Sequence, residues 1–337
     1  MRILIIGGTG LISTAITRQL LEKGADVTLF NRGKTPPRFP KGAKFLYGDR
    51  RDYTTFVQQM REAETFDCVI EMIGYVREDA QSLVQAFAGR TAQVIFCSTV
   101  DVYQRPASRY PYREDEPLRG LSDYARNKIV CEQVLNEAHE RGDFAVTILR
   151  PAHTYGEGGT LIHSFGWSTT YIDRLRKGKP IVVHGDGQSL WVSCHVDDVA
   201  RAFVNAIGNS RAFGRAYHVT GEEWMTWNQY HQKVAQAIGA PEPTLVHIPT
   251  DLLAKVAPER AGICAVNFQF NNIFDNSAAH ADLGFQYTIP FVEGVKRTVA
   301  WLDEQHAIAN SDEDTLEDRV IEAWQKLSEG MERELGV

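Results

Sequence analysis

Short apolar segments rich in β-branched residues alternate with helical patterns along the first half of the chain. The expected strands are Arg2–Ile6, Asp26–Phe30, Lys44–Tyr47, Asp67–Met72, Gln93–Cys97 and Ala145–Leu149. Between strands, segments such as Leu11–Lys23 and Ser122–Glu140 place apolar residues at helical spacing. Strands that are apolar throughout are buried on both faces, and their alternation with helices is typical of parallel sheets with right-handed crossovers. We therefore expect an α/β fold built on a doubly wound parallel sheet.

The pattern becomes looser after about Pro151, where glycine-rich segments separate shorter elements. Expected there are helices at Asp197–Ile207, Thr226–Ile238 and Phe291–Glu304, and a strand at Ala216–Thr220. We divide the chain into a sheet domain at 1–155, with a return segment near 190–220, and a smaller α/β lobe at 156–309. Residues 310–337 form a third, separate segment.

The last segment, 310–337, has the pattern of an amphipathic helix. The acidic stretch Ser311–Asp314 is expected to cap it, near the positive end of the helix dipole. Its apolar positions are Leu316, Val320, Ile321, Trp324, Leu327, Met331 and Leu335. An apolar helix face usually packs on the body of its own protein, which is the favoured interpretation here; a helix that binds a partner is the alternative.

Composition narrows the class of protein. The chain has 337 residues, 36 Lys+Arg and 43 Asp+Glu, so the net charge of −7 argues against a nucleic-acid binder. Five scattered cysteines form no CxxC pair, which argues against a disulfide framework and structural zinc. No window approaches 18 apolar residues, and the apolar run before Gly7 is too short for a signal peptide. We expect a cytoplasmic protein without a membrane span.

A glycine-rich turn follows the first expected strand. Gly7-Gly8-Thr9-Gly10 leads directly into a helix, an arrangement that presents free backbone N–H groups and the helix dipole to a pyrophosphate. Gly7 permits the tight turn, and Gly10 lets the backbone approach the phosphate without a Cβ. The third glycine of the usual pattern is Ser13, which is still small. This turn predicts a Rossmann-type dinucleotide site.

The second expected strand ends at Asn31-Arg32, where NAD enzymes usually place a carboxylate on the ribose. Asn31 does not repel a 2′-phosphate, and Arg32, with Lys34, could pair with one. These residues favour NADP over NAD, although a solvated Arg32 would leave NAD possible. Asp49, after the third strand, could accept a hydrogen bond from the adenine amino group.

Tyr124 and Lys128 form a Tyr-x-x-x-Lys pair on one face of an expected helix. A free tyrosine has a pKa near 10, and a nearby ammonium would lower it by stabilising the phenolate. Tyr124 could then move a proton to or from an alcohol during hydride transfer. Thr99 follows the strand at Gln93–Cys97, at the sheet edge where doubly wound folds bind ligands, so its hydroxyl could hold the reacting oxygen.

These residues carry a resemblance to the extended short-chain dehydrogenase/reductases, the NAD-dependent epimerase/dehydratase group. The matching segments are GGTGLIS at 7–13, GD at 48–49, CSTVDVY at 97–103, YARNK at 124–128, LRPAHTYG at 149–156 and HVDDVA at 195–200. The resemblance implies that Thr99, Tyr124 and Lys128 are catalytic. It also implies a cycle in which a sugar or nucleotide-sugar hydroxyl is transiently oxidised.

We assign the cofactor site, for NAD or NADP, to a set of residues along these segments. They are Gly7, Gly10, Leu11, Ile12, Asn31, Arg32, Asp49, Arg50, Ile73, Ser98, Tyr124 and Lys128. The sheet domain would therefore bind the cofactor, and the lobe at 156–309 would mainly bind the substrate.

Three departures from the family pattern bear on the substrate. Val100 replaces the acid of sugar 4,6-dehydratases and disfavours that reaction, whereas Asp101 could act as an acid or base beside the ketone or be bonded only locally. His153 stands where the family commonly has a substrate-binding Asn, although a structural histidine is equally plausible. Trp191 replaces an Arg that clamps a diphosphate, so it either stacks on the substrate or fills the core.

Polar residues elsewhere are assigned structural roles. Asp197 and Asp198 resemble a metal pair, but they begin a helix and fit a cap or dipole role better, so no metal site is expected. The arginines of the loop at 104–120 could contact an anion, but a solvated loop is favoured.

Two other functions remain open. An NADPH-dependent net ketoreductase of the same fold would suit Asn31 and Arg32. GRAYHVTGEEWMTWNQY at 214–230 and the tail are similar to chloroplast stem-loop-binding proteins, atypical members of the superfamily associated with RNA, but Tyr124, Lys128 and the negative charge speak against RNA. Extended members often form homodimers through the Tyr-x-x-x-Lys helix, which the apolar Ile129, Val130, Val134 and Leu135 would permit.

Overall fold

The computed structural model describes residues 1–336, and these form two compact units. Unit 1 comprises 1–154, 193–222 and 274–289. Unit 2 comprises, among the described residues, 155–192, 223–273 and 290–336. Segment 193–222 returns to unit 1. The segment 274–289 also joins unit 1, which the pattern did not indicate, because no strand or motif marks it.

Unit 1 contains a seven-stranded sheet in the order β11-β6-β5-β4-β1-β2-β3, and all six pairings are parallel. Its strands are β1 (Arg2–Ile6), β2 (Asp26–Asn31), β3 (Lys44–Tyr47), β4 (Cys68–Glu71), β5 (Gln93–Cys97), β6 (Ala145–Pro151) and β11 (Arg215–Val219). The order reverses direction beside β1, the place where doubly wound sheets bind ligands. The predicted doubly wound α/β fold is confirmed.

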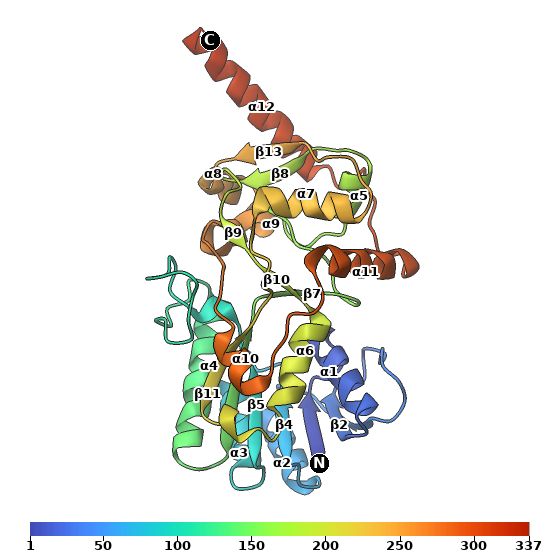
Figure 1. The fold of residues 1–337 in the computed structure, drawn as a ribbon, viewed down its shortest axis with the longest axis vertical. Coiled ribbons are helices and arrows are strands. Elements are labelled where there is room, and N and C mark those ends of the chain that lie inside the picture. The colour runs from blue at the N-terminus through green and yellow to red at the C-terminus, as the bar shows by residue number, and fades with distance from the viewer. Residues whose placement is uncertain (337) are drawn as a thin grey trace. The chain divides into compact units, whose positions relative to one another are not determined.

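Helices cover both faces of this sheet (Figure 1). One face packs against α1 (Leu11–Glu22), α6 (Val196–Ala206) and α10 (Ser277–Leu283). The other face packs against α2 (Tyr53–Glu62), α3 (Arg77–Phe87) and α4 (Asp123–Glu140). The central strands are almost completely buried, as their uninterrupted apolar sequences predict.

Unit 1 also contains short elements at the carboxyl ends of its strands. These are the 3-10 helix η1 (Val100–Val102) and the short strand β10 (Ser193–His195), whereas the 3-10 helix η2 (Ser210–Ala212) precedes β11 at the amino ends. The strand β7 (His153–Tyr155) pairs with β10. All five cysteines are free and buried, so the described structure contains no disulfide, as the spacing predicts.

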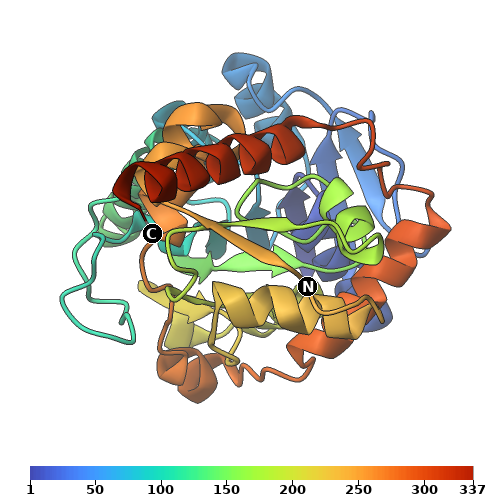
Figure 2. The ribbon, with the colours of Figure 1, turned by 90° about the horizontal axis from the view of Figure 1, so that it is seen from above.

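Unit 2 is a smaller α/β body with its own apolar core. Its strands are β8 (Ile181–His184) with β13 (Leu245–Ile248), which are parallel, and β9 (Leu190–Trp191) with β12 (Met225–Thr226), which are antiparallel. Its helices are α5 (Thr170–Arg176), α7 (Trp227–Ala237), α8 (Thr250–Val256), α9 (Pro258–Ile263), the π-helix η3 (Cys264–Phe268), α11 (Phe291–Glu304) and α12 (Leu316–Leu335). Figure 2 shows α7 and α12 on opposite sides of β8 and β13.

The start of α12 differs from the sequence prediction. Ser311–Asp314 does not cap the helix; Thr315 occupies the N-cap position without a side-chain hydrogen bond. Ser311 is buried and its N–H donates to Asp173, while Asp312 pairs with Lys177 and Lys179. Partners from α5 and the turn after it therefore hold this stretch outside the helix. No helix among the described residues is long and apolar enough to cross a membrane.

Candidate functional site

A cleft of about 760 Å³ opens at the carboxyl ends of the strands of unit 1. It runs from the ends of β2 and β3, past the glycine turn after β1, to the ends of β4 and β5 and the start of α4. Each of the twelve residues assigned to the cofactor from sequence lines this cleft, and so does Thr99. Sequence segments more than a hundred residues apart therefore meet in one elongated site.

The glycine turn adopts a backbone that other residues rarely reach. Gly7 and Gly8 have φ angles of 113° and 76°. A Cβ on Gly8 would lie 2.8 Å from the Leu29 side chain, so a larger residue would clash with β2 in addition to straining the backbone. Gly10 is the N-cap of α1, and its N–H donates to the Ser13 hydroxyl at 2.9 Å. The N-terminal end of α1 thus faces the cleft, as anion binding requires.

The cleft end formed by β2 and β3 is rich in unpaired donors. The side-chain oxygen of Asn31, Oδ1, accepts the Gly33 N–H at 2.8 Å. The side-chain nitrogen of Asn31, Nδ2, is buried without a hydrogen-bond partner. Arg32, Lys34 and Arg51 also line this end. For the side chains of these three cations, the described residues provide no hydrogen-bond or ion-pair partner. The Asp49 carboxylate instead accepts the Arg51 N–H at 2.9 Å.

Arg50 lines the same region, but its guanidinium is committed elsewhere. It donates to the Glu71 carboxylate at 3.0 Å, the Ser82 hydroxyl and the Asp79 carbonyl, and it lies 4.1 Å from the centre of the Phe56 ring. Glu71 is wholly buried and also accepts the Ile73 N–H at 2.8 Å. The side chain of Arg50 therefore supports the loop after β4, and this is a structural role that the sequence assignment did not anticipate.

At the other end of the cleft, Lys128 is buried and fixed in place. Its ammonium donates to the carbonyls of Gly74 at 2.8 Å and Cys97 at 2.7 Å. It also lies 4.9 Å from the centre of the Tyr75 ring. Burial lowers the pKa of Lys128. An ammonium has three donors, so one remains available towards the cleft that Lys128 lines.

Tyr124 lies one helical turn before Lys128 and lines the same end of the cleft. Burial of its phenol, followed by the charges of Cys97 and Asp101, raises the pKa of Tyr124. A hydrogen bond with the Thr99 side chain opposes this rise. The lowering expected from Lys128 is absent, because that ammonium bonds to backbone carbonyls and stays 5.9 Å from the Tyr124 ring centre.

A buried polar network supports the strand end that carries Ser98 and Thr99. Ser98 donates to Glu132 of α4, which is held by Arg150 of β6 at 2.6 Å. Arg150 also donates to the Tyr103 hydroxyl at 2.6 Å, and Tyr103 bonds to His218 at the same distance. This chain of bonds ties β5, α4, β6 and β11 together behind the cleft.

Asp101, His153 and Trp191, which the sequence assigned to the substrate or to proton transfer, do not line this cleft. Each of them has a structural partner. Asp101 pairs with Arg105 at 3.0 Å. His153 bonds to the Ser193 hydroxyl at 2.9 Å, and burial lowers its pKa to about 4, so it is neutral at pH 7. Trp191 is 5% exposed and packs on Trp227 in the core of unit 2. These contacts favour the packing alternatives for the three residues, and their roles in substrate binding or proton transfer stay predictions.

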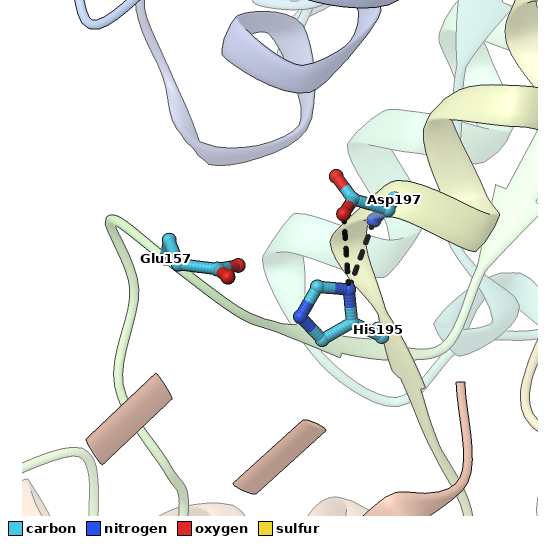
Figure 3. A group of neighbouring side chains, drawn as sticks. All are labelled: Glu157, His195 and Asp197. Atoms are coloured by element: carbon cyan, nitrogen blue, oxygen red, sulfur yellow. Dashed lines mark hydrogen bonds and ion pairs between the residues drawn. The ribbon is translucent and has the colours of Figure 1, made fainter. Parts of the chain in front are cut away.

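The acidic pair after β10 has the helix-start role that the sequence indicated. Asp197 and Asp198 lie in the first turn of α6. Figure 3 shows the His195 imidazole beside Asp197; its Nδ1 accepts the Asp197 N–H at 3.2 Å, which makes His195 the N-cap. The buried Asp198 carboxylate accepts two backbone N–H groups, from Thr288 and Ile289.

The arginines of the loop at 104–120 are mostly paired with acids. Arg105 binds Asp101, Arg109 binds Asp115 and Glu116, and Arg113 lies 3.5 Å from Asp275. This pairing favours the structural interpretation of the loop over an anion contact.

Tyr75 and Arg51 are among the cleft residues that the sequence assignment missed. Tyr75 lies in the loop after β4, with its ring 6.4 Å from that of Tyr124, and Arg51 follows Asp49 at the opposite end. No motif marks Tyr75. The position of Arg51, two residues after Asp49, was a signal, because the ends of β2 and β3 are neighbours in this sheet.

The residues present fit a nicotinamide dinucleotide. The glycine turn and the N-terminus of α1 suit a pyrophosphate, and the unpartnered Asn31 amide suits a ribose or its phosphate. The free donor of Lys128 and the Tyr124 hydroxyl suit a second ribose and a reacting alcohol.

Comparison with known proteins agrees with this geometry. The profile of the NAD dependent epimerase/dehydratase family matches residues 3–220. Chloroplast stem-loop binding protein of 41 kDa b from Arabidopsis thaliana is 31% identical over 259 residues, which are 73% of this chain and 65% of that protein. UDP-glucose 4-epimerase from Mycolicibacterium smegmatis is 30% identical over 237 residues, 69% of this chain and 68% of that enzyme.

A 2′-dehydrokanamycin reductase from Streptomyces kanamyceticus is 25% identical over 275 residues, covering 82% of this chain and 77% of that enzyme. Among solved structures, UDP-glucose 4-epimerase from Thermotoga maritima has a TM-score of 0.74 at 21% identity, covering 91% of this chain and all of that one. The chain belongs to the NAD dependent epimerase/dehydratase family, within the extended short-chain dehydrogenase/reductase superfamily.

Proposed function

We propose that this protein is an NAD(P)-dependent enzyme that transiently oxidises a hydroxyl of a sugar or nucleotide sugar, with Tyr124 as the acid/base group. The observation that carries the proposal is one continuous cleft. It connects a glycine turn suited to phosphate with Thr99, Tyr124 and Lys128 at one end. The family match and the sugar-nucleotide enzymes among the relatives support the same class of reaction.

In this proposal the bound nicotinamide supplies the acceptor and donor of hydride. Tyr124 takes the proton of the alcohol as it is oxidised and returns it when the ketone is reduced. Thr99 holds the reacting oxygen. Lys128, fixed by two carbonyls, holds the neighbouring ribose. Asp101 moving a proton beside the ketone remains a separate hypothesis, and the roles of His153, Trp191 and the lobe at 156–309 in substrate binding remain predictions.

We further propose a preference for NADP over NAD. Asn31 carries no charge to repel a 2′-phosphate. Arg32, Lys34 and Arg51 line the same end of the cleft. In the described structure the three cations have no side-chain partner, so they are free to pair with a phosphate.

Mass spectrometry of the nucleotide released from the denatured protein tests both proposals. Tightly held NAD near one per chain would support a recycled cofactor and contradict the NADP preference. An empty site that binds added NADPH much more tightly than NADH would support the preference. Arg32→Ala and Arg51→Ala should then weaken NADPH binding and spare NADH, with Lys41→Ala, outside the cleft, as the control. Absence of binding to any nicotinamide dinucleotide would overturn the functional proposal.

A net ketoreductase is the second candidate. The cations at the Arg32 end of the cleft and the similarity to 2′-dehydrokanamycin reductase favour it. Exchangeable NADPH consumed in proportion to product would distinguish it from an epimerase, which returns the hydride within each cycle.

RNA binding is a third candidate, raised by the relative named for stem-loop binding. An acidic chain with a net charge of −7 is poorly suited to a polyanion. Filter binding of a stem-loop RNA across a salt series would test it, and tight binding with a steep salt dependence is required.

A homodimer through α4 also remains a proposal. Of the apolar positions that suggested it, Val134 and Leu135 are buried in the unit 1 core, so only Ile129 and Val130 are partly exposed.

A further inference from the structure

Helix α12 has two halves in different surroundings. Its first half is anchored in unit 2: Ile321 is buried, Glu317 accepts the Val182 N–H at 3.0 Å, and Arg174 pairs with Glu317 and Asp318. Its second half extends beyond β8 and β13 (Figure 1). Leu327, Met331 and Leu335 are 58%, 57% and 70% exposed there. The apolar face of α12 is therefore anchored in the core of unit 2 along its first half and exposed to solvent along its second half.

A groove of about 530 Å³ lies beside the first half of α12. Leu252 and Val256 of α8 form one wall, and Leu316, Val320 and Trp324 form the other. The three α12 residues are only partly buried, and Val256 is 50% exposed. The same helix therefore carries an apolar groove along its first half and exposed apolar side chains along its second half.

We propose that α12 pairs antiparallel with α12 of a second copy of this chain, so that the exposed half of each helix covers the groove of the other. A two-fold axis between residues 325 and 326 would place Leu335 opposite Leu316, Met331 opposite Val320, and Leu327 opposite Trp324. Each exposed apolar side chain then meets a partly buried one, and the pairing is isologous, as in most dimers.

The charges beside this face are complementary in the same register. Arg319 lines the groove, and Glu334 lies two residues from position 332, the position opposite Arg319 in the antiparallel pair. In the described residues, neither side chain has an ion-pair partner. Two Arg319–Glu334 pairs would therefore form across the interface, one at each end. An unrelated helix would have to supply both this apolar spacing and these charges, which a second copy already contains.

The first test is the mass of the full chain in solution by light scattering. The proposal expects a mass above that of one chain, and a fall to half in a Met331→Glu/Leu335→Glu variant. Arg333→Glu is the control, because Arg333 lies on the opposite face of a helix with ~3.6 residues per turn, and it should leave the mass unchanged. A wild-type protein of one chain, or a mass unaffected by the double substitution, would overturn the proposal.

A charge exchange makes the test specific to this register. Arg319→Glu and Glu334→Arg should each weaken self-association about tenfold, and the double variant should largely restore it. Two weakened single variants without restoration would contradict the antiparallel pair. Pairing through α4 would instead leave every one of these masses unchanged. None of these measurements uses activity, so they stand apart from the proposed function.

Discussion

The two units place titratable side chains in different surroundings, in a cleft in unit 1 and in a buried core in unit 2. In unit 1, Tyr124 and Lys128 line a cleft at the sheet edge. In unit 2, His231 and Tyr171 are wholly buried and bond to each other at 2.7 Å, and His163 stacks on Tyr171 with ring centres 4.5 Å apart. Residues that can do chemistry therefore indicate a site where they line the cleft, whereas these three residues of unit 2 belong to its core.

The largest effect that tests this comparison is expected at Tyr124. Tyr124→Phe keeps the ring but removes the group that carries the proton, so turnover should fall by about 10²–10⁴-fold. Cofactor affinity should hardly change, because the ring still packs. Single-turnover absorbance of the reduced nicotinamide and a binding titration would measure the two. Tyr47→Phe, at an exposed tyrosine outside the cleft, is the control; a Tyr124→Phe enzyme with most of its activity would refute the assignment.

In unit 2, truncation of the Trp191 side chain should lower the free energy of unfolding. Trp191→Ala removes a ring packed on Trp227 and Phe268, so we expect a loss of about 3–5 kcal/mol in unfolding free energy. Urea denaturation measures this loss. Trp224→Ala, at a tryptophan that is 45% exposed, should cost about 0.5 kcal/mol or less. A Trp191→Ala protein that keeps its stability but shows a raised KM would instead support the stacking hypothesis.

Acid should destabilise the buried histidines of unit 2. Burial lowers the pKa of His184 to about 4 and of His231 to about 3, below the unfolded value of 6.5. Between these values the unfolded state binds more protons, so stability is complete above pH 6.5 and falls with acidification, by at most about 1.4 kcal/mol per pH unit for each histidine. Unfolding free energies across that range should show a shallower slope in His231→Gln. The exposed His306→Gln is the control, and equal slopes in all three proteins would contradict the explanation.

The smallest effect is expected at Asp101, for which both a role in the reaction and a structural role are hypotheses. Its partner Arg105 suggests a local structural role, so Asp101→Asn should reduce turnover less than about tenfold. Solvent-proton exchange into the product is the sharper readout. Lost exchange with hydride transfer retained would instead assign proton chemistry to Asp101.

Much of unit 1 could be predicted from sequence, because continuous apolar strands and a glycine turn are local signals. The strand at Arg2–Ile6 and the helix carrying Tyr124 lie where predicted, and the motif residues meet in one cleft. Tyr75 was missed because its place depends on how the loop after β4 folds over Lys128. The side-chain role of Arg50 was missed because its partners Glu71 and Asp79 lie 21 and 29 residues away, with no periodicity linking them. Ser311 was taken for part of a cap, since the pairing of this stretch with α5 has no local signal.

The two carbonyls that hold Lys128 have a consequence for the temperature dependence of the enzyme. A free lysine side chain carries ~2 kcal/mol of rotamer entropy, but here the ammonium is ordered by the backbone of Gly74 and Cys97 before any ligand arrives. Its immobilisation is completed when the chain folds and need not be repeated in each catalytic cycle. Warming that loosens these two strand ends should therefore slow catalysis while the rest of the sheet is still intact.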